Sequence, residues 1–177
     1  MSAAVSLLGG DAPTASAIDL YAKPSPDFST KLHETIVTLR KAASAGPVAQ
    51  ANSLGAEDMV LTDLIVKTKL PIEIFSLDTG RLPPETYDLM AAVHKHYGLK
   101  LKVYFPQAEE VESYVRQHGI NAFYDSVTLR KACCYARKVE PLKRALAGKR
   151  AWITGLRAQQ ATTRTGLPFR EYDEGNG

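Results

Sequence analysis

Residues 72–83 read Ile-Glu-Ile-Phe-Ser-Leu-Asp-Thr-Gly-Arg-Leu-Pro, and this stretch decides the fold. Its first half is short and mostly apolar, with β-branched and aromatic residues, which favours a buried strand. Residues 78–80 then provide a turn, and a helical pattern begins at Pro83 and extends to about Tyr97. A strand that leads through a short turn into a helix is the building unit of a parallel sheet, because parallel strands need a crossover connection.

The same unit recurs on both sides of this stretch. Further strands are predicted at residues 48–51, 99–105, 151–154 and 169–172. Further helices are predicted from Asp27 to Gly46 and at residues 56–69, 108–118 and 139–146, with a short one at 16–21. Strands that alternate with helices of these lengths predict an α/β fold, with a mostly parallel sheet and helices on both of its faces.

The length and composition fit one globular domain. The chain has 177 residues, of which 45% are hydrophobic and 23% charged. Residues 1–26 are rich in Gly, Ala, Ser and Pro without a sustained period, so we expect a mobile N-terminal arm there and the domain itself over residues 27–177. The sequence stops directly after the last expected strand, and we expect the domain to be incomplete at its C-terminus.

Several classes of protein are disfavoured. The net charge of +3 is too small to argue for a nucleic-acid partner. No apolar run is long enough to span a bilayer, and no basic region precedes the short apolar patch at the N-terminus as in a secretory signal. The two cysteines, Cys133 and Cys134, are adjacent and provide no disulfide framework. We therefore expect a cytoplasmic protein without a membrane partner.

Ligands of parallel sheets bind at the carboxyl ends of the strands, so the turns there hold the candidate site. Residues 52–58, Asn-Ser-Leu-Gly-Ala-Glu-Asp, lie between a strand and a helix, where backbone N–H groups and the helix dipole suit a phosphate. Ser53 adds a hydroxyl donor, and Gly55 permits close approach of an anion. The loop matches neither the Walker A motif nor the dinucleotide fingerprint, and an ordinary helix cap is the alternative.

Two more turns follow predicted strands. After Leu77, either Asp78 or Thr79 could hold a ribose or a metal-bound ligand, and the main chain could contact an adenine edge; a simple tight turn is the alternative. After the strand at 151–154, Arg157 and Arg164 offer guanidinium forks that suit phosphate or sulfate. Solvated loop arginines are the alternative there.

The cysteine pair lies among basic residues that gather between residues 130 and 150. Nearby cations favour the thiolate, which is the form that binds iron, but an iron–sulfur cluster normally needs four thiolates. Two buried small side chains or a redox-active pair are the alternatives. Lys138 follows Cys134 by four residues and shares its face if the segment is an α-helix. The scattered histidines lack metal-site spacing, and we assign them structural or surface roles.

In their order along the chain, these segments resemble the bacterial assimilatory sulfonucleotide reductases, from about residue 27 to 165. The most specific part is Cys-Cys-x-x-Arg-Lys-x-Glu-Pro-Leu at residues 133–142, which is similar to the iron–sulfur subclass that reduces adenylylsulfate rather than phosphoadenylylsulfate. The resemblance implies the adenine nucleotide alpha hydrolase (PP-loop) fold. It also implies reduction of adenylylsulfate to sulfite and AMP in sulfate assimilation for cysteine biosynthesis, with thioredoxin as reductant, by a protein that forms homo-oligomers.

The resemblance also implies roles for residues. Ser53 and Gly55 would lie at the phosphosulfate; Leu77, Asp78 and Thr79 would line the adenine pocket; Arg157 and Arg164 would clamp the sulfonucleotide; Cys133 and Cys134 would be two of four ligands of a [4Fe–4S] cluster; and Lys138 would link cluster and substrate electrostatically. This sequence lacks the family's second cysteine pair and the C-terminal tail that holds the nucleophilic cysteine. We therefore expect this chain alone to be inactive.

Two other functions stay open. A nucleotide-binding PP-loop-like protein without redox activity would not need the missing cysteines. An adenylating PP-loop enzyme is disfavoured, because the Ser-Gly-Gly-x-Asp-Ser type of loop is not present. One further departure concerns Asn52, which stands where relatives often carry a serine.

Overall fold

A computed structural model describes residue 23, residues 25–156 and residues 168–175 of the chain. It divides into two compact units, Met1–Thr35 and Ile36–Gly177. In the first unit helix α2 (Phe28–Ser44) begins, and it continues into the second. The helix predicted at residues 16–21 and nearly all of the N-terminal arm predicted at 1–26 lie outside the described residues, so both stay predictions.

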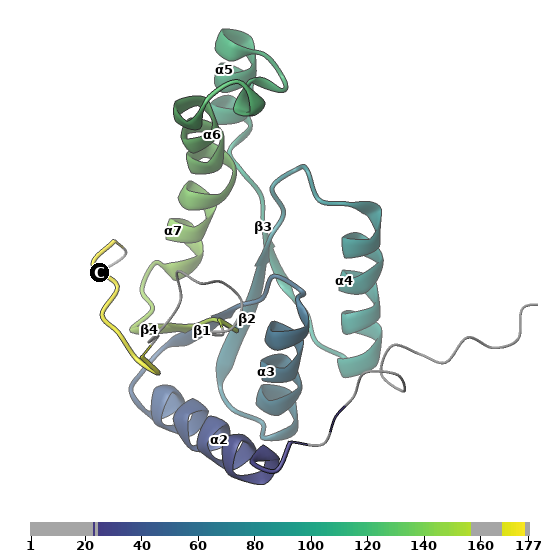
Figure 1. Ribbon diagram of the computed structural model, residues 1–177, viewed down its shortest axis with the longest axis vertical. Helices are drawn as coiled ribbons and strands as arrows, with labels where there is room; N and C mark the ends of the chain where they lie inside the picture. The colour runs from purple at the N-terminus through teal and green to yellow at the C-terminus, as the bar shows by residue number, and fades with distance from the viewer. Residues whose placement is uncertain (1–22, 24, 157–167, 176–177) are drawn as a thin grey trace, which may run out of the picture. The chain divides into compact units, whose positions relative to one another are not determined.

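The second unit contains a parallel sheet with the strand order β3-β2-β1-β4 (Figure 1). Strand β1 (Val48–Ala51) pairs on one side with β2 (Ile72–Leu77) and on the other with β4 (Ala151–Ile153), so that Val48 lies opposite both Ile72 and Ala151. Strand β3 (Lys102–Tyr104) pairs with the end of β2. Strands β1, β2 and β3 therefore follow one another toward one edge of the sheet, and β4 lies on the opposite side of β1.

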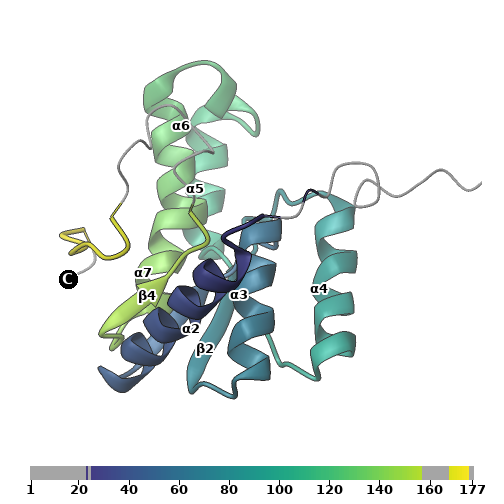
Figure 2. The same ribbon diagram turned by 60° about the horizontal axis from the view of Figure 1, so that its bottom comes forward.

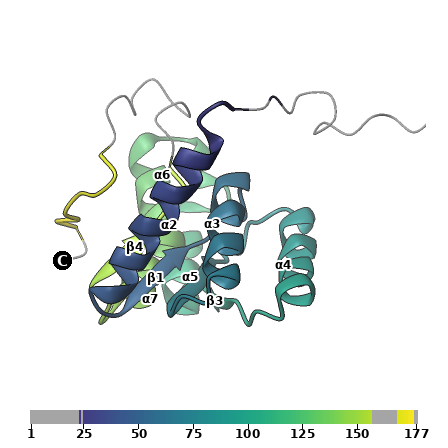
Figure 3. The same ribbon diagram turned by 90° about the horizontal axis from the view of Figure 1, so that it is seen from below.

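The helices follow from this strand order. Helix α3 (Ala56–Lys67) joins β1 to β2, and α4 (Pro84–Tyr97) joins β2 to β3. The long return from β3 to β4 contains α5 (Ala108–His118), a 3₁₀ turn (Ala122–Tyr124), α6 (Val127–Cys134), a π-helical turn (Tyr135–Val139) and α7 (Glu140–Leu146). Right-handed crossovers in opposite directions place these two groups on opposite faces. Figures 2 and 3 show α3 and α4 together on one face and α5 to α7 on the other.

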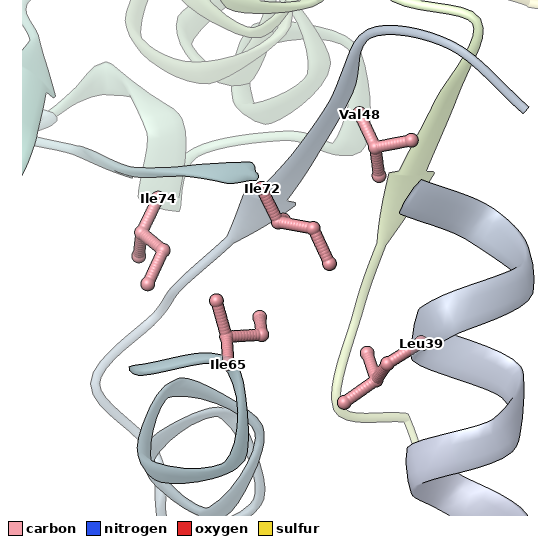
Figure 4. Packing of buried hydrophobic residues seen from close by; sticks show 5 residues of the cluster. All are labelled: Leu39, Val48, Ile65, Ile72 and Ile74. Atoms are coloured by element: carbon pink, nitrogen blue, oxygen red, sulfur yellow. The ribbon is translucent and has the colours of Figure 1, made fainter. Parts of the chain in front are cut away.

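Both faces of the sheet are packed. On one face Val48, Ile72 and Ile74 meet Leu39 of α2 and Ile65 of α3, as Figure 4 shows. On the other face the residues next to them in the strands, Ala49 and Phe75, pack against Ala145 and Leu146 of α7. Because successive strand residues point to opposite faces, a strand that is buried on both sides is mostly apolar. This explains why Ile72, Ile74 and Phe75 are all buried although they point to different faces.

The predicted α/β fold class is confirmed, with differences at particular elements. The strand predicted at 99–105 shortens to Lys102–Tyr104, because the N–H of Leu101 bonds to the carbonyl of Leu99 and not to β2. Residues 169–172 form no strand; instead Trp152 Nε1 donates to Asp173 Oδ2 at 2.9 Å and holds this segment by a side chain. The helix predicted at 139–146 is only the end of a helical stretch that begins at Val127.

Across the described ranges, no helix is both long and apolar enough to cross a membrane.

Candidate functional site

The reversal of strand order between β1 and β4 locates the candidate site. The chain leaves β1 toward β2 on one side and returns to β4 on the other side. In sheets of this kind the loops at the carboxyl ends of the two strands diverge, and the space outside them is where ligands bind. The loops in question begin with Asn52 after β1 and with Thr154 after β4.

The side chain of Asp58 joins these two loops. Asp58 is the third residue of α3, and it is 7% exposed. Its Oδ2 accepts hydrogen bonds from the Ser53 N–H at 2.8 Å and from the Ser53 hydroxyl at 2.6 Å. Its Oδ1 accepts from the N–H of Gly155 at 2.8 Å. A carboxylate in the first turn of a helix is also favoured by the helix dipole. One buried carboxylate therefore fixes the distance between the β1 and β4 loops.

The contact with Asp58 leaves no space for a side chain at residue 155. A Cβ atom on Gly155 would lie 2.6 Å from Oδ1 and 2.8 Å from the backbone nitrogen of Asp58. Atoms at such distances overlap, so one of the two loops would have to move. Glycine is required here by close approach of two chain segments and not by a turn.

Buried polar side chains next to Asp58 form hydrogen bonds with its backbone and with one another. Gln50 Nε2 donates to the carbonyl of Asp58 at 2.7 Å, and Thr62 Oγ1 donates to Gln50 Oε1 at 3.0 Å. Asn52 Nδ2 donates to Thr62 Oγ1 at 2.8 Å, and Asn52 Oδ1 accepts from the N–H of Leu54 at 2.6 Å. We call Gln50, Asn52, Ser53, Asp58, Thr62 and Gly155 the Asp58 network. Because buried polar groups that are paired with one another resist displacement, this network fixes the loop after β1.

Asn52 therefore shapes the loop from inside the protein. It is 2% exposed, and its hydrogen bond to Leu54 holds that residue at φ +67, in the left-handed region. Asn side chains commonly stabilise such turns by bonding to the backbone two residues on. Asn52, which stands where relatives often carry a serine, therefore helps to hold the loop in its conformation.

The loop after β2 is shaped by a second buried carboxylate. Asp78 is 5% exposed, and its Oδ1 accepts from the N–H of Gly80 at 2.7 Å and from the hydroxyl of Tyr87 in α4 at 3.0 Å. Desolvation and this hydrogen bond raise the pKa of Tyr87. Leu77, the last residue of β2, and Thr79 are half-buried. Because β2 lies beside β1, this loop stands next to the loop that carries Ser53 and Gly55.

Two arginines connect the β2 loop with the helices that carry the cysteines. Arg137 Nη1, from the π-helical turn, donates to the carbonyl of Thr79 at 2.8 Å. Arg81, from the β2 loop, donates to Asn121 Oδ1 at 3.3 Å and to the carbonyl of Ile120, and its guanidinium lies 4.7 Å from the ring centre of Phe123. The structure therefore brings the helical segment that carries Cys133 and Cys134 into direct contact with the loop after β2, which is predicted to bind adenine.

The two cysteines have different surroundings. Cys133 is 8% exposed and packs with Tyr114 and Ala122, whereas Cys134 is exposed, and both thiols are free. Lys138 is exposed on the π-helical turn. The segment is helical, as the prediction for Lys138 requires, although the turn after Cys134 is π-helical, with hydrogen bonds between residues five apart.

The residues of this chain do not complete a [4Fe–4S] site. Such a cluster needs four thiolates, and the sequence has two cysteines. In the part of the chain that the structure describes, no three His, Cys, Asp or Glu side chains are grouped so that they could hold a metal. Cys133 and Cys134 could supply at most half of the ligands, so we derive no step through a cluster.

Some site residues stay untested, and others were missed. Arg157 and Arg164 lie outside the described residues. The sequence pattern favours Asp58 as an acidic residue at a helix start, and it indicates no role for Gly155 or Arg137. An acidic residue at the third position of a helix that follows a strand was the available signal for Asp58, because such residues often bond back to the preceding loop.

A doubly wound α/β domain whose ligand loops meet at the reversal of strand order is the class that the fold and site define. Residues 47–177 match the family model described as the phosphoadenosine phosphosulfate reductase domain. The chain therefore belongs to this family.

Individual relatives agree with this assignment. The chain is 58% identical over 127 residues to an adenosine 5′-phosphosulfate reductase of Allochromatium vinosum, covering 72% of this chain and 50% of the relative. It is 46% identical over 157 residues to the enzyme of the same name from Neisseria meningitidis serogroup B, covering 88% and 61%. A crystal structure of phosphoadenylyl-sulfate reductase from Candida auris, a phosphate complex, aligns with a TM-score of 0.66 at 28% identity, covering 88% and 77%. The chain spans about half to three fifths of the length of these two curated relatives.

Proposed function

We propose that this chain is the nucleotide-binding part of an adenylylsulfate reductase, which reduces adenylylsulfate to sulfite and AMP in sulfate assimilation. The observation that carries the proposal is the Asp58 contact with Ser53 and Gly155, which joins the two loops at the reversal of strand order. Family membership supplies the class of reaction, and the cysteine pair favours adenylylsulfate over its 3′-phosphorylated analogue.

The proposed reaction divides into two steps. A cysteine thiolate attacks the sulfur of adenylylsulfate, the bond from sulfur to the phosphate oxygen breaks, and AMP leaves. Thioredoxin, a dithiol, then supplies two electrons, releases sulfite from the enzyme thiosulfonate and becomes a disulfide. The family resemblance assigns the attacking cysteine to a C-terminal tail that this sequence does not contain. Neither Cys133 nor Cys134 has that role in the proposal.

The geometry limits what Ser53 can do. Its hydroxyl hydrogen is directed to Asp58 Oδ2, so the hydroxyl orients the loop in this structure and does not point a donor at an anion. The carboxylate of Asp58 also offsets part of the positive end of the α3 dipole. An anionic phosphosulfate near Ser53 and Gly55 therefore needs cations from elsewhere. We assign that charge to Arg157, to Arg164 and to Lys138, whose position in the chain follows the cysteine pair.

The other assignments follow the resemblance. Adenine contacts the main chain around Leu77, Asp78 and Thr79, and Cys133 and Cys134 are two of four ligands of a [4Fe–4S] cluster whose remaining ligands lie outside this sequence. We also propose a cytoplasmic location, a homo-oligomeric assembly and no nucleic-acid or membrane partner.

A calorimetric titration of the protein with AMP and adenylylsulfate tests the proposal. We expect saturable binding of both ligands and at least a tenfold loss of affinity in Arg157→Ala, because a bidentate arginine contact with phosphate or sulfate contributes about 1.5–3 kcal/mol. Arg116→Ala, on the exposed end of α5, serves as the matched control. A folded chain that binds neither ligand would overturn the assignment of the site.

Assays of iron and labile sulfide on protein prepared without oxygen address the rival function. Iron bound through Cys133 and Cys134, and lost in the double serine variant, supports the reductase. Nucleotide binding without iron does not separate the two functions, because the two cysteines of this chain cannot complete a cluster of four thiolates.

A further inference from the structure

Arg137 occupies a position between the cysteine pair and the loop after β2. It lies on the π-helical turn that begins directly after Cys134, and it is half-buried. Its Nη1 donates to the carbonyl of Thr79 at 2.8 Å. The adjacent Gly80 has φ +69, and a Cβ atom there would lie 3.2 Å from the same nitrogen. The guanidinium therefore packs directly against the backbone of the loop.

The helix fixes the base of this side chain. Ala136, the preceding residue, is 7% exposed, and Pro141 is among the fully buried side chains. Cys133, one residue before the exposed Cys134, packs with Tyr114 and Ala122. Because buried residues lie on both sides of Arg137 along the helix, the packing of the helix determines where the Arg137 side chain starts and which way it extends. Movement of the helix at the cysteines would move the guanidinium with it.

The hydrogen bond from Arg137 orients a specific peptide unit. The carbonyl of Thr79 and the N–H of Gly80 belong to one planar group, and that N–H donates to Asp78 Oδ1 at 2.7 Å. Arg137 and Asp78 thus hold the two ends of this peptide unit. Arg81, the residue after Gly80, is held by contacts of its own side chain with Ile120, Asn121 and Phe123. The main-chain direction from Asp78 to Arg81 is therefore determined by side chains on both sides.

We propose that Arg137 is a positioning residue, which holds the loop after β2 in the conformation that receives the adenine ring. This inference rests on the proposed function, because the loop meets adenine only if the chain binds an adenine nucleotide. Arg137 acts through the carbonyl of Thr79. It is distinct from the arginines proposed to clamp the phosphosulfate, which are required for charge.

Adenosine and AMP distinguish positioning from direct phosphate binding. If Arg137 orients the adenine loop, Arg137→Ala weakens both ligands by the same factor, about tenfold, since one charge-assisted hydrogen bond is lost. If Arg137 contacts the phosphate, AMP weakens and adenosine does not, which would overturn the proposal. Arg137→Lys retains the charge but not the planar fork, so we expect a partial loss for both ligands. Arg130→Ala, exposed on α6, is the control and should leave both affinities unchanged.

Hydrogen–deuterium exchange tests the contact without any nucleotide. In Arg137→Ala, we expect the amides of Gly80 and Arg81 to exchange at least fivefold faster, whereas those of β1 and β2 stay as in the unsubstituted protein. Unchanged exchange at Gly80 and Arg81 would overturn the positioning role even if AMP binds. If the unsubstituted protein binds neither AMP nor adenosine while exchange responds as expected, the proposed function fails and the contact between Arg137 and the loop still stands.

Discussion

The Asp58 network and the Cys-bearing segment (residues 108–139) both border the predicted ligand loops, but they are built differently. In the network, Gln50, Asn52 and Thr62 are at most 2% exposed and bond to one another. In the Cys-bearing segment, large apolar side chains face solvent: Ile120 is 61% exposed and Tyr124 is 80% exposed. This segment reaches the β2 loop through Arg81 and Arg137, which bond to main-chain carbonyls.

The difference indicates how each region should respond to change. A buried network of short side chains has one favourable arrangement, because any displacement leaves a buried polar group unpaired. The arginine contacts of the partly exposed boundary each hold only the loop segment to which they bond, so the loss of one leaves the buried network paired. We therefore expect substitutions in the Asp58 network to lower global stability more than substitutions in the Cys-bearing segment do.

The largest effect is expected from Asp58→Asn. The amide keeps the shape of the side chain, but it has only one acceptor, so a donor is turned toward Gly155 or toward Ser53. We expect the free energy of unfolding in urea to fall by about 3 kcal/mol, as for a buried charged hydrogen-bond acceptor. The control is Asp63→Asn in the same helix, which loses a surface contact with Lys67 and should cost about 0.5 kcal/mol. Equal losses in the two variants would show that Asp58 does not organise the loops.

Gly155→Ala should be the next most harmful. The added methyl group overlaps Asp58, so the loops must separate, and overpacking of this kind costs about 2 kcal/mol. Gly55→Ala is the matched control, because a Cβ atom there would lie 3.4 Å from Ser53 Oγ, at ordinary contact distance. Thermal unfolding of both variants measures the difference. An alanine at 155 that is tolerated as well as one at 55 would mean that the contact between the loops is loose.

The sequence predicts the sheet well and the contacts between distant segments poorly. The strands at 48–51 and 72–77 are predicted correctly because each is a short, mostly apolar stretch followed by turn residues. The bond between Asp58 and Gly155 joins residues 97 positions apart, and that between Arg137 and Thr79 joins residues 58 apart. Neither pairing is visible until β4 is placed beside β1 and the return helices are placed on the sheet.

In the Cys-bearing segment the helix at 108–118 is predicted correctly, whereas the helical stretch from Val127 to Lys138 is not predicted. Helix prediction relies on apolar residues spaced for an α-helix, and the π turn at Tyr135–Val139 changes that spacing in mid-segment. After this turn, the sequence predicts a helix again at residues 139–146.

Serine substitution and thiol labelling of the cysteines test the Cys-bearing segment directly. Cys133→Ser places a hydroxyl among Tyr114 and Ala122 and should lower the stability of the metal-free protein by about 1 kcal/mol. Cys134→Ser, at the exposed neighbour, should leave stability unchanged and serves as the control. Labelling with a disulfide reagent should modify Cys134 at once and Cys133 slowly. Equal labelling rates would contradict the packing of Cys133.

The smallest expected effect concerns the response to acid. On β2, burial raises the pKa of Glu73, but hydrogen bonds from Lys102 and Lys149 outweigh it, and the pKa lies below its ordinary value. A carboxylate whose pKa is lowered in the folded state stabilises the protein above its unfolded pKa, and this contribution is lost as the pH falls through the folded value. The arginine contacts of the Cys-bearing segment have no such dependence, because guanidinium groups keep their charge in this range.

Urea unfolding at pH 7 and pH 4 measures this contribution. Glu73→Gln removes the titrating group, so we expect the variant to be slightly less stable than the unsubstituted protein at pH 7 and to lose less stability on acidification. Glu112→Gln, exposed on α5 in the Cys-bearing segment, should leave the pH dependence unchanged. If Glu112→Gln flattened the pH dependence and Glu73→Gln did not, acid sensitivity would originate in the Cys-bearing segment. The contrast between the ion pairs of Glu73 on β2 and the arginine contacts of the Cys-bearing segment would then be wrong.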